Sequence, residues 1–270
     1  MIKIYNKDCF ETIDILLHNN NSKVNMILTS PPYNVGKHSN RKADLNNYDG
    51  KYDIYMDAKT PQEYIKWCVD LFNKFDDVLL DNGVILWNMS YGSNSKVNKD
   101  SNDVMWILLA ELIKNTNFTI ADRIIWKKKS ALPNNSSPNK LTRIVEDVFV
   151  FVRNNEYTTY YANKPLTSIS KSGQKFYGSK FNFIEAKNND GVCPYNKATF
   201  STDLVLSLFD LYVPESARNE NYFVFDPFMG SGTTLCACEE YGVSGIGSEI
   251  SENQCNWASK RLHGANIKEV

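Results

Sequence analysis

The feature that most restricts the fold is a regular alternation of short apolar runs with amphipathic segments of helical spacing. The strand-like runs are 3–5, 26–28, 84–88, 120–126, 147–152, 222–225 and 245–247. The helix-like segments are 61–80, 104–114, 203–211, 233–241 and 251–262. This alternation predicts an α/β domain built on a mainly parallel sheet.

The strongest local signal is the stretch FVFDPFMGSGTT, from Phe223 to Thr234. An apolar strand runs into a turn that contains Gly230 and Gly232, a helix follows, and Glu249 ends the next strand, 19 positions after Gly230. Glycines let the backbone approach a ligand, a helix start offers free N–H groups, and such an acid accepts hydrogen bonds from ribose hydroxyls. The pattern alone leaves S-adenosylmethionine, a dinucleotide and a plain strand–helix turn open. The missing third glycine favours a cofactor without a pyrophosphate, and a P-loop is excluded because the chain has no GxxxxGK[S/T].

A second stretch, TSPPYN from Thr29 to Asn34, ends another apolar run abruptly. The adjacent residues Pro31 and Pro32 cannot continue a helix and remove two backbone N–H donors. The result is a stiff loop that offers carbonyl oxygens and, through Tyr33, an aromatic face.

Residues 130–195 interrupt the alternation. They begin with the loop-like sequence SALPNNSSPNKL and continue with mixed basic and aromatic residues. From Arg123 to Lys187 there are 12 Lys or Arg against 4 Asp or Glu, a local net charge of +8 in a chain of net charge −1. Basic residues interleaved with aromatic ones suit contact with phosphates, sugars and bases, so we expect an inserted nucleic-acid-binding lobe. A solvated Lys-rich surface is the alternative.

The composition indicates an ordinary globular protein of the cytoplasm. No run of about 18 apolar residues predicts a membrane span, and the first residues do not resemble a signal peptide. The six cysteines form no CxxC pair, so we expect reduced thiols and no metal site.

Together the two motifs resemble the β group of DNA amino-methyltransferases, which methylate N4 of cytosine or N6 of adenine with S-adenosylmethionine. The catalytic motif precedes the glycine motif, and this order implies a circularly permuted Rossmann-like methyltransferase fold with a mainly parallel sheet. The resemblance covers nearly the whole chain and includes KDCFETIDIL from Lys7, DNGVILWNMS from Asp81 and TRIVEDVFVFVR from Thr142, in which Glu146 takes the family's acidic position. The segment NKATFSTDLV departs from the family pattern, because Asn196-Lys197 replace His-Pro and Ser201 replaces the last Pro.

The resemblance implies roles for the residues at matching positions. The catalytic residues are Ser30, Pro31, Pro32 and Tyr33. The cofactor-binding residues are Asp8, Thr199, Phe200, Asp226, Pro227, Phe228, Gly230, Ser231, Gly232, Thr233 and Glu249. For DNA contact we expect basic residues in and near the lobe: Lys127, Arg143, Lys164, Lys171, Lys175 and Lys180. The implied division is 1–129 and 196–270 for the catalytic and cofactor parts, with 130–195 as the target-recognition lobe.

The implied substrate is double-stranded DNA with the target base flipped out of the helix. The Ser30 hydroxyl and the Pro31 carbonyl each accept one N–H of the exocyclic amine, and Tyr33 stacks on the base. Transfer is then direct and in line, and no strong general base is required. Ser30 favours cytosine N4, because relatives with Ser here lean toward cytosine and those with Asp or Asn toward adenine. Adenine N6 stays the alternative, since Pro31 and Tyr33 serve either base.

Other classes of function fit the residues less well. A nucleotide-dependent oxidoreductase would use only the glycine turn, and a non-catalytic DNA-binding module need not keep either motif. Carbon-5 cytosine methylation needs a nucleophilic thiol, usually in a Pro-Cys pair, and the chain has only the reverse order, Cys193-Pro194. A glutamine- or RNA-directed methyltransferase more often has Asn where Ser30 stands. The sequence leaves open whether the protein dimerises and whether a cognate restriction endonuclease accompanies it.

Overall fold

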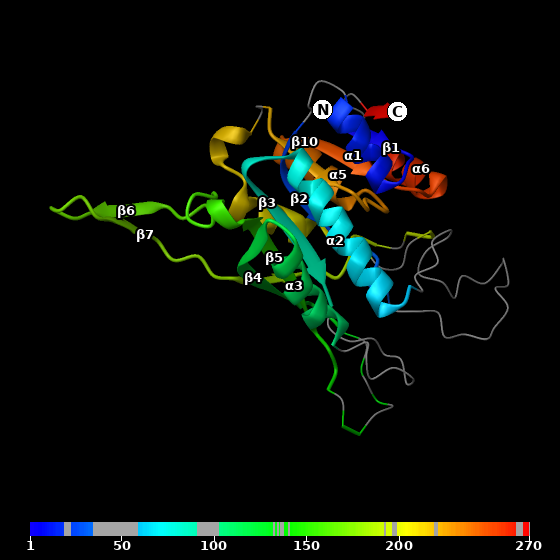
Figure 1. Cartoon of the computed structure of the whole chain (residues 1–270), viewed down its shortest axis with the longest axis horizontal. Helices are drawn as coiled ribbons and strands as arrows, with labels where there is room; N and C mark the ends of the chain where they lie inside the picture. Colours follow the sequence, from blue (N-terminus) through cyan, green and yellow to red (C-terminus); the bar gives the residue numbers. More distant parts are fainter. Residues whose placement is uncertain are drawn as a thin grey trace.

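The structure is a computed structural model that describes residues 1–18, 23–34, 59–90, 103–131, 133, 135, 138–139, 141–191, 193–195, 199–218, 221–262 and 267–269. Its centre is a nine-stranded sheet with the strand order β11-β1-β10-β9-β2-β3-β5-β4-β8. Figure 1 labels several of these strands and the helices packed against them. The strands of this sheet are β1 (Ile2–Tyr5), β2 (Val24–Thr29), β3 (Leu79–Met89), β4 (Phe118–Lys128), β5 (Val145–Arg153), β8 (Phe183–Ala186), β9 (Phe223–Asp226), β10 (Ser244–Ser248) and β11 (Ile267–Glu269). Every neighbouring pair is parallel except those made by β5, which runs antiparallel to β3 and β4. The α/β class and the mainly parallel sheet are therefore confirmed.

Helices cover both faces of the sheet. One apolar core packs α1 (Cys9–His18), α2 (Pro61–Val78) and α3 (Val104–Asn115) against one face. The other core packs α4 (Thr202–Tyr212), α5 (Thr233–Tyr241) and α6 (Glu252–Arg261) against the opposite face. Short 3-10 turns lie at Asn154–Glu156 and Glu215–Ala217. Among the described residues, no helix has both the length and the apolar character needed to cross a membrane.

The helix predicted at 61–80 shows how local sequence sets its bounds. Thr60 accepts a hydrogen bond from the Glu63 N–H while the Glu63 side chain accepts one from the Thr60 N–H, so a capping box starts α2 and Pro61 occupies the first turn. Its end was predicted two residues too late, because Leu79 is already extended and begins β3. The helix α1 was not among the predicted helices, although Asp8 caps its first turn by accepting a hydrogen bond from the Phe10 N–H at 2.9 Å.

The described part of the predicted lobe, residues 130–195, includes strands of the central sheet. β5 lies between β3 and β4, and β8 extends the sheet beside β4, so both belong to the central sheet. The part outside the sheet is a hairpin of β6 (Leu166–Ile169) and β7 (Lys175–Tyr177), which projects to the far left of Figure 1. We call residues 164–180 the arm. The boundaries predicted at 130 and 195 therefore enclose two sheet strands as well as the arm, since buried strands and loops alternate within this segment.

Candidate active site

The two motifs meet at one edge of the sheet, which we call the carboxyl edge. Strands β9 and β2 are parallel neighbours, with Ile27 beside Phe225, so their carboxyl ends lie together. The helix that follows β9 covers one face and the helix that follows β2 covers the other. Such neighbours form a topological switch point, where open α/β sheets bind ligands.

A hydrogen bond joins the motifs directly. The Thr29 hydroxyl at the end of β2 donates to Asp226 Oδ1 at 2.6 Å. Asp226 also accepts from the Thr234 hydroxyl at 2.5 Å and from the Phe228 N–H at 3.0 Å, and only 1% of the residue is exposed. Burial raises the pKa of the Asp226 carboxyl to about 6, although these hydrogen bonds oppose the rise. Asp226, predicted to contact the cofactor, has both carboxyl oxygens occupied by internal donors in this structure.

The glycine turn has the geometry that its sequence predicts. Gly230 and Gly232 have positive φ angles of 51° and 79°, and a Cβ on Gly232 would lie 2.6 Å from the Cβ of Ala258. The Glu249 carboxylate faces the turn, where it accepts hydrogen bonds from the Gly230 N–H at 3.1 Å and the Ser251 N–H at 2.9 Å. The turn and the acid predicted to bind one ligand are thus in direct contact.

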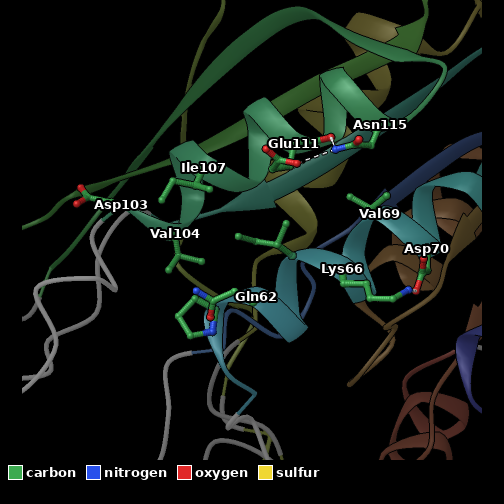
Figure 2. Close-up of a pocket in the computed structure, with 11 residues that line it drawn as sticks. Gln62, Lys66, Val69, Asp70, Asp103, Val104, Ile107, Glu111 and Asn115 are labelled. Carbon is green, nitrogen blue, oxygen red and sulfur yellow. Dashed lines mark hydrogen bonds and ion pairs between the residues drawn. The ribbon is translucent and has the colours of Figure 1, made fainter.

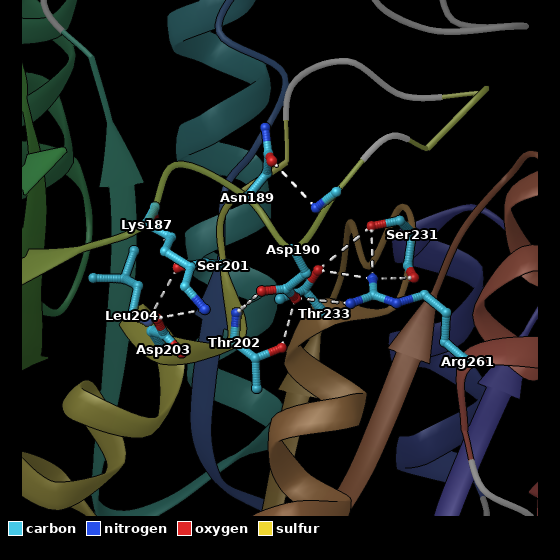
Figure 3. Close-up of polar contacts among 11 residues, drawn as sticks. Lys187, Asn189, Asp190, Ser201, Thr202, Asp203, Leu204, Ser231, Thr233 and Arg261 are labelled. Carbon is cyan, nitrogen blue, oxygen red and sulfur yellow. Dashed lines mark hydrogen bonds and ion pairs between the residues drawn. The ribbon is translucent and has the colours of Figure 1, made fainter. Parts of the chain in front are cut away.

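An arginine that the sequence analysis missed is bound to the same turn (Figure 3). Arg261, at the end of α6, donates to the Ser231 carbonyl at 2.8 Å and to Thr233 Oγ1 at 3.0 Å. Its other nitrogen pairs with Asp190 at 2.8 Å, and Asp190 accepts from the Thr202 N–H and hydroxyl at the start of α4. We call this set of contacts the Arg261–Asp190 clamp. It ties the segment before α4 to the glycine turn, and no local pattern in the sequence marks it.

The Ser30–Asn34 loop is fixed from the side of α2. Tyr64 in α2 donates its hydroxyl to the Pro32 carbonyl at 2.8 Å. Asn34 has a φ of 52°, in the left-handed region that Asn tolerates, and its side chain both donates to the Lys59 carbonyl and accepts from the Lys59 N–H at 2.8 Å. Pro31 is buried. These contacts anchor the loop and add to the stiffness expected from its two prolines.

A polar chain leads from this loop across the neighbouring strands. Ser30 Oγ donates to the Tyr33 hydroxyl at 2.9 Å. The Tyr33 oxygen lies 2.7 Å from Asn88 Oδ1 and 3.3 Å from Glu146 Oε2, and either oxygen can accept its one proton. Lys128 Nζ pairs with Glu146 Oε1 at 2.5 Å. Asn88 and Lys128 come from the ends of β3 and β4, and Glu146 from the start of β5. The resemblance puts Glu146 at a family position, but it assigns no role to Asn88 or Lys128, although each lies at or near the end of a predicted strand.

The remaining predicted cofactor residues lie on several different elements. Asp8 follows β1, the neighbour of β10, and its side chain accepts the Phe10 N–H. Pro227 is buried, and the ring of Phe228 lies 5.5 Å from that of Trp67. Thr199 is half-buried, whereas Phe200 is 8% exposed and belongs to the apolar core beneath α4. Asn196 and Lys197, where the chain departs from the family pattern, lie outside the described residues.

The residues predicted to bind DNA fall into two groups. Lys127 and Arg143 flank the β4–β5 connection at the carboxyl edge, where Lys127 also pairs with Glu185 at 2.8 Å. The arm instead follows Arg153 at the far end of β5, beside Phe118 at the start of β4. The seven residues from Asp147 to Arg153 span about 20 Å at the usual rise of a strand. Lysines 164, 171, 175 and 180 of the arm are exposed, and the chain reaches the arm from the edge opposite Ser30.

A groove of about 730 Å³ lies between α2 and α3 (Figure 2). Its lining includes Ile65 and Val69 of α2 and Val104 and Ile107 of α3, together with polar residues such as Glu111. None of its lining residues belongs to either motif. The groove is therefore a surface feature separate from the switch point.

Comparison with known proteins identifies the family. A family model described as DNA methylase, for N6 and N4 methyltransferases, matches residues 24–260. Type II methyltransferase M.BglII from Bacillus subtilis is 24% identical over 97% of this chain and 69% of its own length. Orphan methyltransferase M.BamHII from Bacillus amyloliquefaciens is 26% identical over 88% of each chain.

Solved structures agree with the fold. The PvuII DNA methyltransferase (cytosine-N4-specific) superposes with a TM-score of 0.69 and 17% identity, over 98% of this chain and 87% of that one. The M1.HpyAVI–SAM complex superposes with a TM-score of 0.60 and 21% identity, over 97% of this chain and 100% of that one. These matches confirm the Rossmann-like methyltransferase fold that the resemblance implied. The chain belongs to the N6/N4 family of DNA methylases and is a DNA methyltransferase.

Proposed function

We propose that this enzyme transfers a methyl group from S-adenosylmethionine to the N4 amino group of a cytosine flipped out of double-stranded DNA. The observation that carries the proposal is the contact between the two motifs at the switch point, where Thr29 of β2 is bonded to Asp226 of β9 at 2.6 Å. This contact holds the loop that would receive the base next to the turn that would hold the cofactor. Reacting groups held in this way gain rate through proximity and orientation.

The residues at the glycine turn fit S-adenosylmethionine. Gly230 and Gly232 allow the left-handed backbone of the turn, and the half-buried Glu249 carboxylate can accept hydrogen bonds from both ribose hydroxyls. The turn does not continue into a phosphate-cradling GK[S/T] sequence, which suits a cofactor without a phosphate. When bound, this cofactor supplies an electrophilic methyl group.

The Ser30–Tyr33 loop supplies the chemistry on the side of the base. The Ser30 hydroxyl and the Pro31 carbonyl accept the two N–H groups of the amine, which draws the nitrogen toward tetrahedral geometry and frees its lone pair for attack. Because the prolines and Tyr64 fix the loop beforehand, this stabilisation needs little reorganisation. The ring of Tyr33 offers a face for stacking on the flipped base.

Two observations favour cytosine over adenine. Ser30 places a small neutral hydroxyl where a carboxylate would cost more to desolvate against the base. The solved neighbour with a TM-score of 0.69 is named as cytosine-N4-specific. Adenine N6 is the alternative outcome of the same chemistry, because Pro31 and Tyr33 serve either base.

Nucleoside mass spectrometry after reaction of DNA with isotopically labelled S-adenosylmethionine tests the proposal. We expect label in N4-methylcytosine. Label found only in N6-methyladenine would show that adenine N6 is the target instead. The Ser30→Ala variant should lower turnover far more than affinity for S-adenosylmethionine, because the hydroxyl acts mainly as the amine becomes tetrahedral. Normal turnover by this variant would remove the Ser30 argument.

We further propose that methylation protects DNA sites from a cognate restriction endonuclease, as the Type II name of M.BglII suggests for that relative. The test is digestion of methylated plasmid by restriction enzymes of known site. Size-exclusion chromatography with light scattering decides whether the enzyme acts as a monomer or as a homodimer.

A further inference from the structure

The polar chain that begins at Ser30 has a direction. Tyr33 can donate only one proton, and the two groups next to it on the far side from Ser30 are Asn88 Oδ1 at 2.7 Å and Glu146 Oε2 at 3.3 Å. A carboxylate and an amide oxygen accept hydrogen bonds and cannot donate them. The Tyr33 proton is therefore directed away from Ser30.

Two further contacts prevent this direction from reversing. Asn88 Nδ2 donates to the Asp147 carbonyl at 3.2 Å, which fixes the amide with its oxygen toward Tyr33. Lys128 pairs with Glu146 at 2.5 Å and holds that carboxylate in place. Asn88 is 4% exposed, and the side chains of Glu146 and Lys128 are 13% and 23% exposed, so water competes weakly for these bonds.

The direction of the Tyr33 proton determines which hydrogen bonds the Ser30 hydroxyl can make. Because the Tyr33 proton points elsewhere, the Tyr33 oxygen accepts the Ser30 proton at 2.9 Å. Among the residues that the structure describes, no group donates to Ser30 Oγ, so its lone pairs remain available. A serine hydroxyl without such a partner could rotate and donate to the amine lone pair, which must instead attack the methyl group.

We propose that Asn88 and Glu146 are positioning residues that act through the Tyr33 hydroxyl to make Ser30 a dedicated hydrogen-bond acceptor for the target amine. This inference rests on the proposed function and gives Tyr33 a second role beside stacking. It also predicts that the hydroxyl of Tyr33 and the hydroxyl of Ser30 contribute to one effect. Their removal should therefore be strongly non-additive.

The test is a double-mutant cycle measured by single-turnover methylation of DNA, with S-adenosylmethionine affinity measured by calorimetry. Tyr33→Phe keeps the stacking ring and removes only the hydroxyl. We expect Tyr33→Phe and Ser30→Ala each to slow transfer about 10- to 100-fold, and the double variant to be no slower than Ser30→Ala alone. Asn88→Leu should slow transfer in the wild-type background and have little effect in the Tyr33→Phe background.

Tyr64→Phe is the matched control, because the Tyr64 hydroxyl also binds this loop but contacts the Pro32 carbonyl instead of Ser30. Its effect should add to that of Ser30→Ala. Cofactor affinity should be unchanged in Tyr33→Phe and Asn88→Leu, which also shows that the variants are folded. If the wild-type enzyme is active and the rate losses of Ser30→Ala and Tyr33→Phe are additive, this inference is wrong but the proposed function is not affected. Absence of methyl transfer to any DNA by the wild-type enzyme would overturn the proposed function as well.

Discussion

Asp226 makes the fold sensitive to pH at the point where the two motifs join. Its carboxyl is 1% exposed and accepts hydrogen bonds from Thr29, Thr234 and the Phe228 N–H. The substitution Asp226→Asn keeps the size of the side chain and removes its charge. Either hydroxyl can rotate to accept from the new amide, so we expect this variant to fold.

The magnitude follows from the raised pKa. Burial raises the pKa of Asp226 from 3.8 to about 6 in the folded protein. A group with a raised folded pKa stabilises the fold fully below its unfolded pKa, and this contribution is lost as the pH rises through the folded pKa. Between pH 4.5 and pH 7, the free energy of unfolding should therefore fall by about 2 kcal/mol through this one group. The Asp226→Asn protein lacks this contribution. The free energy of unfolding of the variant minus that of the wild type should therefore be about 2 kcal/mol more negative at pH 4.5 than at pH 7.

Urea denaturation of both proteins at a series of pH values measures this difference. Asp70→Asn is the control, because Asp70 pairs with Lys66 on the surface and its side chain is 49% exposed. The control should follow the wild-type pH dependence closely. If the curves of wild type and Asp226→Asn stay parallel between pH 4.5 and pH 7, the buried carboxyl does not titrate as reasoned.

The other predictions concern ligand binding. Arg261→Ala removes the clamp between Asp190 and the glycine turn, so S-adenosylmethionine affinity measured by calorimetry should fall about tenfold. Arg261→Lys should restore the affinity only in part, because the single ammonium group of lysine cannot bind both partners as the guanidinium does. Glu249→Ala should weaken cofactor binding by about 1–3 kcal/mol through unpaired ribose hydroxyls, and unchanged affinity would remove Glu249 from the site. Charge reversal of Lys171, Lys175 and Lys180 together should lower DNA affinity and its salt dependence if the arm binds DNA, with cofactor affinity unchanged. An unchanged salt slope would exclude the arm as a DNA contact.

The sequence predicts the parts of this site whose chemistry is local. The glycine turn needs positive φ angles at Gly230 and Gly232, and only a few residues adopt them, so the turn is visible in the sequence. The stiffness of the Ser30–Asn34 loop likewise follows from adjacent prolines. The strand-like patterns located β1 to β5, β9 and β10, and most apolar side chains of these strands are buried.

The parts that depend on register between distant strands were not visible. Asn88 and Glu146 reach Tyr33 only because Met89 of β3 pairs with Asp147 of β5 in antiparallel register. The Arg261–Asp190 clamp joins residues 71 positions apart, and an arginine near the end of a helix is ordinary in a sequence. Asp226 also carries no local sign that its carboxyl turns inward, because its partners Thr29 and Thr234 come from two different elements.

The reversal of β5 also separates basic residues that are contiguous in the sequence. Because β5 runs antiparallel to β4, the β4–β5 connection lies at the carboxyl edge with Ser30, whereas the arm begins beyond Arg153 at the opposite edge. The arm contains no Asp or Glu, and its side chains Ile169, Phe176 and Tyr177 are exposed. The connection that contains Arg143 thus leaves the sheet at the same edge as Ser30. The predicted DNA-contacting residues therefore belong to two surfaces, Arg143 at the carboxyl edge and the lysines of the arm beyond the opposite edge. If both surfaces bind DNA, charge reversal at each should lower the salt dependence of binding separately.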